Sequence, residues 1–228
     1  MNNPNLPILP IYLTGDIHGE WNVHEWHAED LSDCYLIALG DVGIGFIPEK
    51  KQMRQIKLIE QWHKKRNIQF IGLRGNHDDL SYFQGQINLP FFKLVPDYTR
   101  MNLNGMDILM VGGAISIDRK KRKPGTSYWE DEIFVLQEDK ALPCDVLLTH
   151  SAPIWNGPMD KRGIEDWCEK DSTLWRDCMK EREDHTRLID LCKPKRHYCG
   201  HFHESCAATF EGCRSRILNI NEIIGLHP

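Results

Sequence analysis

Short apolar runs alternate with amphipathic stretches along the first third of the chain. Three of these runs predict β-strands, at residues 11–14, 34–39 and 68–73. Two helices are predicted between them, a polar one over residues 20–30 and a clearer one from Pro48 to Arg66, in which Met53, Ile56 and Ile59 recur at helical spacing. The β-α-β-α-β alternation predicts parallel strand pairing through right-handed crossovers.

A different pattern follows in the second half. Asn104-Gly105 separates two apolar strands, residues 100–103 and 106–111, and predicts a β-hairpin with a tight turn. Further short strands are predicted at residues 145–149, 196–199, 207–210 and 215–220. We expect the second half to add a mainly antiparallel sheet to the first, with helices outside both sheets.

Residues 154–186 carry three tryptophans and many charges, but little strand signal. We interpret them as a partly helical, Trp-rich insertion on the rim of the site, and its last helix is expected to continue to Cys192. The insertion is therefore placed at about residues 154–192.

Length and composition limit the choices further. The 228 residues are 41% hydrophobic and 27% charged, which is typical of one large globular domain or at most two small ones. The net charge of −5 provides no global attraction to nucleic acid or to anionic membranes. No secretory signal and no apolar run long enough to span a membrane are recognised, so a cytoplasmic protein is expected. The eight cysteines contain no C-x-x-C pair, which favours reduced thiols over a zinc site or disulfides.

Chemistry-bearing side chains stand where predicted strands end. Five segments share this position: Thr14-Gly15-Asp16-Ile17-His18, Gly40-Asp41, Gly75-Asn76-His77-Asp78, Thr149-His150 and Gly200-His201-Phe202-His203. The first four follow clear apolar runs, and the fifth follows a weaker one. Side chains at the carboxyl ends of neighbouring strands converge on the crevice where open α/β sheets bind ligands.

Carboxylate, imidazole and carboxamide groups together predict a metal centre. Asp16 and His18 lie two residues apart, on one side of an extended chain, and so can bind one cation; His201 and His203 have the same spacing. The two carboxylate oxygens of Asp41 can bridge two cations. Mixed nitrogen and oxygen ligands suit zinc, manganese or iron better than calcium or magnesium. Seven such groups exceed the needs of one ion, and two ions about 3.5–4 Å apart would use them all.

Each segment alone is weak, since a histidine or a Gly-Asn turn at a strand end is common. The five segments together, in this order, resemble the calcineurin-like metallophosphoesterase superfamily. The resemblance spans residue 11 to about residue 220. It implies an α/β (α+β) fold, a four-layer sandwich of two mixed β-sheets flanked by helices, and a single domain over residues 1–228.

The resemblance also implies a role for each matching residue. Asp16, His18 and His203 would hold the first metal, Asn76, His150 and His201 the second, and Asp41 would bridge them. His77 would face the scissile phosphate and stabilise its charge or protonate the leaving oxygen. Asp78 would accept a hydrogen bond from His77 and orient it.

A second cluster begins at Gly112-Gly113 and continues through a basic loop, residues 119–123. The glycine pair permits close backbone approach to a ligand. Arg119 and Arg122 are candidates for binding a substrate phosphate, and a solvated basic loop is the alternative. Tyr128 and Trp129 could stack on a base or simply pack beneath the loop.

The sequence therefore predicts a dinuclear metal-dependent phosphoesterase that hydrolyses phosphate mono- or diesters by attack of a metal-bridging hydroxide. Manganese is the preferred metal, with iron, zinc and nickel as alternatives. A nucleotide or nucleic-acid phosphodiesterase and a protein phosphatase remain alternatives on the same site, and a non-catalytic scaffold of the same fold is a remote one. A phosphate-ester substrate, such as a nucleotide or short nucleic acid, is the expected partner, with no membrane and no obligate protein partner.

Overall fold

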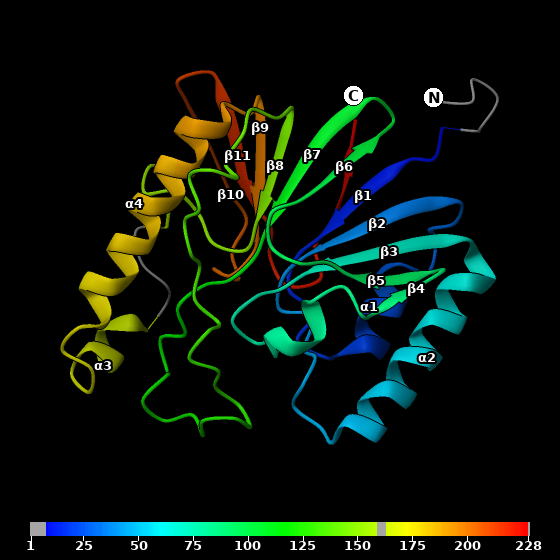
Figure 1. Cartoon of the computed structure of the whole chain (residues 1–228), viewed down its shortest axis with the longest axis horizontal. Helices are drawn as coiled ribbons and strands as arrows, with labels where there is room; N and C mark the ends of the chain where they lie inside the picture. Colours follow the sequence, from blue (N-terminus) through cyan, green and yellow to red (C-terminus); the bar gives the residue numbers. More distant parts are fainter. Residues whose placement is uncertain (1–7, 159–162, 228) are drawn as a thin grey trace.

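The computed structural model describes residues 8–158 and 163–227. Within these residues the strands form two six-stranded sheets that face each other, with helices on both outer faces (Figure 1). This is the four-layer sandwich of mixed sheets that the sequence predicted.

The first sheet has the strand order β12-β1-β2-β3-β5-β4. Its strands are β1 (Ile11–Thr14), β2 (Cys34–Leu39), β3 (Ile68–Leu73), β4 (Asn88–Leu89), β5 (Phe92–Leu94) and β12 (Ile223–Leu226). The four central strands are parallel, and β12 and β4 pair antiparallel at the two edges. The predicted bounds of β1, β2 and β3 are confirmed, because these strands are buried on both faces and carry continuous apolar runs.

The second sheet has the strand order β10-β11-β9-β8-β7-β6. Its strands are β6 (Thr99–Leu103), β7 (Met106–Val111), β8 (Val146–Thr149), β9 (Arg196–Cys199), β10 (Cys206–Phe210) and β11 (Cys213–Ile217). The expectation of a mainly antiparallel sheet was wrong, since β7, β8, β9 and β11 pair parallel and only the two edge strands are antiparallel. Long connections between short strands, including helix α4, supply the crossovers that parallel pairing needs.

Helices cover the outer faces of both sheets (Figure 1). Helices α1 (Trp21–His27) and α2 (Glu49–Arg66) pack on the first sheet through a cluster that includes Ile56 and Phe70. The left-handed residue Asn67 ends α2, as C-terminal caps commonly do. The predicted Trp-rich insertion contains α3 (Ile164–Cys168) and α4 (Leu174–Cys192), and α4 packs on the second sheet. Residues 159–162 of the insertion lie outside the described residues.

The core between the sheets is apolar and continuous, with Leu39, Leu73, Met110 and Leu148 among its buried members. The parallel strands β1, β2 and β3 of the first sheet and β8 and β9 of the second have their carboxyl ends along one border of the sandwich. A one-turn 3-10 helix, η1 (Leu80–Phe83), follows the third predicted segment. None of the described helices combines the length and the apolar character that crossing a membrane requires.

Candidate active site

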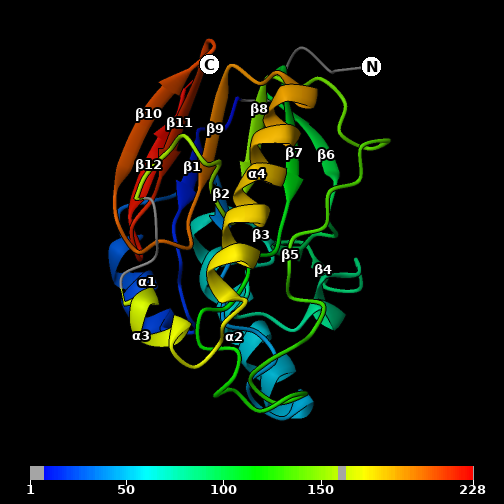
Figure 2. The ribbon, with the colours of Figure 1, turned by 90° about the vertical axis from the view of Figure 1, so that its left-hand side faces the viewer.

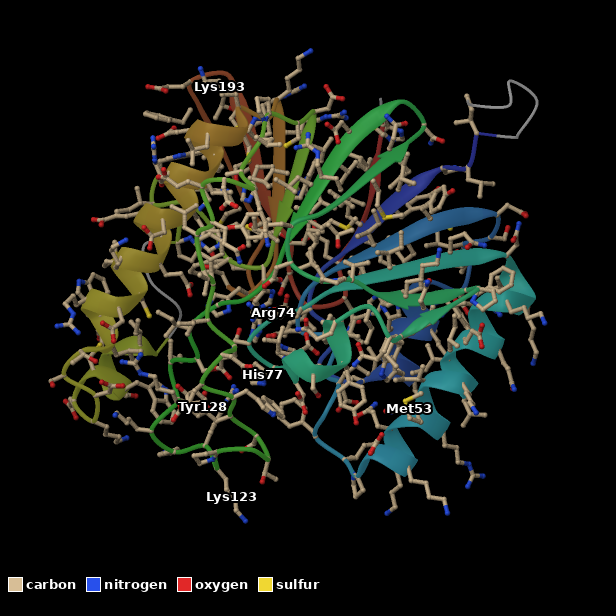
Figure 3. All side chains as sticks on the ribbon, in the orientation of Figure 1. Met53, Arg74, His77, Lys123, Tyr128 and Lys193 are labelled. Carbon is tan, nitrogen blue, oxygen red and sulfur yellow. The ribbon has the colours of Figure 1, made fainter. Side chains whose placement is uncertain are left out.

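The five predicted segments come together at the carboxyl ends of β1, β2, β3, β8 and β9. His77 marks this place in Figure 3, below the strand ends and between the two sheets. All seven predicted metal ligands lie here, and five of them are buried: Asp16, Asp41, Asn76, His150 and His201. The convergence of side chains from both sheets is the feature that the spacing in the sequence could only suggest.

A first group of ligand atoms surrounds the end of β1. Asp16, His18, Asp41 and His203 each offer an atom, and these atoms all lie within 4.8 Å of one another. The Nε2 atoms of His18 and His203 are 2.9 Å apart, and His203 Nε2 is 3.1 Å from Asp16 Oδ2. The backbone N–H of His201 donates to both oxygens of Asp16, which holds this carboxylate in place.

A second group lies beside the first, at the ends of β3, β8 and β9. The side-chain oxygen of Asn76 is 2.8 Å from His201 Nδ1 and 3.0 Å from His150 Nε2. His150 Nδ1 lies 2.7 Å from the Leu39 carbonyl, which can only accept, so Nδ1–H donates and Nε2 faces the centre. When the ring is neutral, it therefore presents the Nε2 lone pair to the centre, as a metal ligand requires.

Asp41 stands between the two groups. Its Oδ1 is 3.2 Å from His150 Nε2 and accepts the His77 N–H at 2.7 Å, while its Oδ2 is 3.7 Å from His18 Nε2. Oδ2 is buried and has no hydrogen-bond partner among the described residues. Burial would raise the pKa of Asp41, but His150 above all, with His77 and His18, holds that pKa well below its usual range. Asp41 is therefore a buried carboxylate that faces both ligand groups.

The same charges act on His150. Burial lowers the pKa of this imidazole, but Asp41 in the first place, followed by Asp16, raises it to about 9. Two anionic carboxylates and several imidazoles thus share one buried space. Burying two carboxylates together costs free energy unless a cation compensates their charge.

Glycines precede several of these ligands for a steric reason. A Cβ atom at Gly75 would lie 2.1 Å from Asp41 Oδ1, and one at Gly200 would lie 2.1 Å from Asp16 Oδ1. The carboxylates occupy the space that any larger residue would need. The glycine in these motifs is therefore part of the ligand geometry.

His77 lies beside the two ligand groups and faces the basic loop. Its ring is edge-on to His18, with the ring centroids 4.8 Å apart, and stacks on Phe46. The guanidinium of Arg122 contacts both ring nitrogens, with Nη2 3.1 Å from Nδ1, and the same residue donates to the Asn76 carbonyl at 3.3 Å. Because arginine has no acceptor atom, the imidazole accepts this hydrogen bond. His77 and Arg122 together form a polar pair at the rim of the centre.

Backbone groups surround the Asp78 carboxylate, and its predicted role of orienting His77 stays a prediction. Its carboxylate is fully buried and accepts four backbone N–H groups, from Val42, Gly43, Ile44 and Gly75, at 2.8–3.0 Å. Burial and the nearby Asp41 raise its pKa to about 7, against the effect of these donors. Asp78 therefore connects the loop after β2, which follows Asp41, to the loop after β3, which contains Asn76.

The structure separates the two candidate arginines. Arg122 pairs with Asp118 at 2.7 Å and also reaches His77. Arg119 is bound by two carboxylates, Asp171 at 2.6 Å and Asp177 at 2.7 Å, and its hydrogen bond with Asp171 above all raises its pKa. Arg119 thus links the basic loop to the start of α4 (Leu174–Cys192) and has its charge neutralised there. The substrate-binding role predicted for it stays a prediction, and the geometry favours Arg122 for that role.

The predicted glycine pair, Gly112-Gly113, allows close approach to the backbone of Arg74. A Cβ at Gly112 would lie 2.4 Å from the carbonyl oxygen of Arg74, which itself accepts the N–H of Gly113 at 3.0 Å. The buried Arg74 side chain pairs with Asp97 at 2.8 Å and donates to the carbonyl of Glu132. Arg74, which the sequence reasoning missed and which lies near His77 in Figure 3, therefore holds residues 112–113 and 132–133 together.

Ser116 was also missed, although it lies in the segment already singled out. The Asn76 Nδ2 group donates to the buried Ser116 Oγ at 2.9 Å. Trp129 packs edge-on against Phe46 and thereby lies one ring away from His77. All eight cysteines are free in the structure.

The donor set fits two divalent cations. Imidazole nitrogens, carboxylate oxygens and one carboxamide oxygen converge in two adjacent groups, and the bare Asp41 Oδ2 lies where a cation would compensate it. Asp16, His18 and His203 would hold one ion, Asn76, His150 and His201 the other, with Asp41 shared between them. The centre is therefore a candidate metal site on the ground of its own chemistry.

Comparison with known proteins identifies the class. The family model of calcineurin-like phosphoesterases matches residues 9–205, and the chain belongs to that family. No curated protein matches the chain in sequence.

Three solved structures are similar to it in fold. GAP50, the anchor in the inner membrane complex of Plasmodium, is 14% identical with a TM-score of 0.48, over 93% of this chain and 72% of that one. Phosphopantetheinyl hydrolase from Mycobacterium tuberculosis is 14% identical with a TM-score of 0.43, over 93% and 90% of the two chains. A protein described as a 5′-nucleotidase from Staphylococcus aureus is 13% identical with a TM-score of 0.45, over 94% and 49%.

Proposed function

We propose that this chain is a dinuclear metal-dependent phosphoesterase that hydrolyses phosphate mono- or diesters, with manganese as the preferred metal. The observation that carries the proposal is Asp41, a buried carboxylate with one oxygen toward each ligand group and no protein partner for Oδ2 among the described residues. Two divalent cations bound here would neutralise phosphate oxygens and lower the pKa of a bound water molecule.

The chain's own residues would position and protonate the ester. Arg122 and His77 face the same space, and a phosphate entering it would accept the hydrogen bonds that Arg122 now donates to the imidazole. Released from Arg122, His77 can stabilise charge on the phosphate or give a proton to the departing oxygen. Phe46, stacked on His77, holds the ring at this rim.

The Trp129–Phe46 pair forms an aromatic edge next to His77, where the non-reacting part of a substrate would lie. We propose a nucleotide or short nucleic-acid ester as the natural substrate on this ground, because aromatic side chains stack on bases. Comparing the rate of hydrolysis of a nucleotide ester with that of a phosphopeptide tests this choice of substrate.

The test is a substrate panel on metal-stripped protein with manganese, zinc, iron or nickel restored. Nitrophenyl phosphate, bis-nitrophenyl phosphate, cyclic nucleotides, dinucleotides and a phosphopeptide separate monoesterase, diesterase and protein phosphatase activity. We expect hydrolysis that depends on added metal and that Asp41→Asn abolishes, since this substitution removes the shared charge. Failure to hydrolyse any ester with all four metals, in protein that binds them, would make the chain a scaffold instead.

A further inference from the structure

A basic groove lies at one edge of the sandwich, and none of the seven candidate metal ligands lines it. It encloses about 590 Å³. The arginine groove, as we name it, is defined by Arg196 of β9, Arg214 and Arg216 of β11, and His227 after β12, with Tyr198 among the other lining residues. Figure 2 shows these strands together at one edge of the molecule.

The groove exists because the second sheet extends beyond the first. Strand β12 is the last strand of the first sheet, whereas the second sheet continues past β9 to β11 and β10. Along β11, Cys213 and Ile217 pack in the clusters on the outer side of the sheet, so Arg214 and Arg216 project from the inner face. Arginines therefore occupy the face that, in the central strands, forms the apolar core between the sheets.

Two of these arginines are direct neighbours. Arg196 and Arg214 are in register on the parallel strands β9 and β11, and like charges directly opposite each other in a sheet are destabilising. The next pair in the same register is Tyr198 and Arg216. Two cross-strand pairs, Arg196–Arg214 and Tyr198–Arg216, thus place three guanidinium groups and one phenol ring side by side in the groove.

Little in the protein offsets this charge. Arg216 pairs with Glu222, but among the described residues the Arg196 guanidinium is placed against only the His227 carbonyl and, at 3.1 Å, the sulfur of Met106. The Arg214 guanidinium makes no hydrogen bond or ion pair within residues 8–158 and 163–227, although the backbone N–H of this residue donates to the Lys195 carbonyl. Two adjacent positive charges without a carboxylate partner stand out in a chain whose net charge is −5.

We propose that the arginine groove binds a ligand carrying two or more phosphate groups, at a site separate from the metal centre. Guanidinium groups bind phosphate oxygens by paired hydrogen bonds, and a phosphate between Arg196 and Arg214 would remove their repulsion. A second phosphate would reach Arg216, and Tyr198 offers a ring for a base. Free oligophosphates and the backbone of a short single strand share this chemistry.

The test compares the manganese-loaded wild-type protein with Arg196→Gln/Arg214→Gln. Arg187→Gln is the matched control, because Arg187 is an exposed arginine on α4 that pairs with Glu138 outside the groove. Tripolyphosphate is titrated by calorimetry, and a labelled single-stranded pentanucleotide by fluorescence anisotropy. The metal centre is the same in all three proteins, so a difference between their titrations belongs to the groove.

We expect the wild type and the control to bind one more equivalent of tripolyphosphate than the double variant, or to bind it about tenfold more tightly. Without ligand, Arg214→Gln should melt at or above the wild-type temperature because a repulsion is removed, and tripolyphosphate should raise only the wild-type melting temperature. Pentanucleotide binding at lower concentration than tripolyphosphate would identify a strand as the ligand, and the reverse order a free oligophosphate.

Identical titrations of the double variant and the wild type, with both probes, would overturn the proposal. An equal loss in Arg187→Gln would also overturn it, because binding would then follow total charge. Hydrolysis of nitrophenyl phosphate by all three proteins tests the proposed catalytic function independently, so that failure of one proposal is distinguishable from failure of the other.

Discussion

Ser116 sets the orientation of the Asn76 carboxamide. The Ser116 hydroxyl accepts the Asn76 NH₂ group at 2.9 Å, so the Asn76 oxygen faces His150 and His201. A neutral ligand that could present either end of its amide is thereby held with its acceptor toward the centre. Partners of this kind orient ligands and tune metal affinity.

Ser116→Ala should therefore weaken metal binding at the Asn76 group by about 10- to 100-fold, because the amide loses its partner. Manganese titration of the apoprotein measures this directly. Ser127→Ala is the control, since the Ser127 hydroxyl lies in the same loop but accepts only the Lys123 N–H. Equal manganese affinity in wild type and Ser116→Ala would show that other contacts orient Asn76.

His77→Ala should keep both metals and lose about 10²- to 10⁴-fold in kcat, the usual size of a general acid effect. The reason is its position beside the ligand groups, where its backbone N–H binds Asp41 but its ring faces Arg122. His150→Ala is the matched variant and should lose metal, because it removes a buried donor. Metal analysis with steady-state kinetics on nitrophenyl phosphate separates the two outcomes, and loss of metal from His77→Ala would mean that the ring is itself a ligand.

Arg122 and Arg119 should behave differently. Arg122→Ala should lower kcat/KM by about 10- to 100-fold on natural and synthetic esters alike, since a charge-assisted hydrogen bond to the phosphate is lost. Arg119→Ala should mainly lower the free energy of unfolding, by about 1–2 kcal/mol, because its partners Asp171 and Asp177 lose their cation. Kinetics and urea unfolding on both variants test this, and a larger kinetic effect from Arg119→Ala would restore its predicted role at the substrate.

The stability of the fold should fall in mild acid because of two core histidines. Burial lowers the pKa of His24 to about 4 and that of His63 to about 3, from an ordinary value of 6.5. The unfolded chain takes up these protons first, so their contribution is fully present above pH 6.5 and is lost as the pH falls toward 4. The free energy of unfolding should decrease there by up to about 1.4 kcal/mol per pH unit for each group.

Urea unfolding between pH 7 and pH 4 measures this slope. His63→Phe should reduce it, because the new ring can keep the stacking on Phe70 but cannot be protonated. His227→Gln, an exposed change after β12, should leave it as in the wild type. An unchanged slope in His63→Phe would show that His63 does not contribute to the acid sensitivity.

The sequence by itself determined the elements that are buried on both faces and the residues that form the centre. Strands β1, β2, β3 and β7 match their predicted bounds, because central strands carry apolar runs that local pattern reveals. The ligand residues were visible because a buried centre needs particular donor groups beside glycine, and Gly75 and Gly200 have no room for a Cβ. These requirements act over a few neighbouring residues, so they leave a signature in the chain itself.

Only the tertiary structure decided what the side chains of these motifs contact. The predicted antiparallel second sheet was wrong, since parallel pairing depends on which distant strands meet. Asp78 looked like a partner for its neighbour His77, yet it accepts backbone groups from residues 42–44 across the site. Arg119 and Arg122 are alike in sequence, but one meets Asp171 and the other His77. Contacts between segments far apart in the chain depend on how the two sheets pack, and no local pattern of residues encodes them.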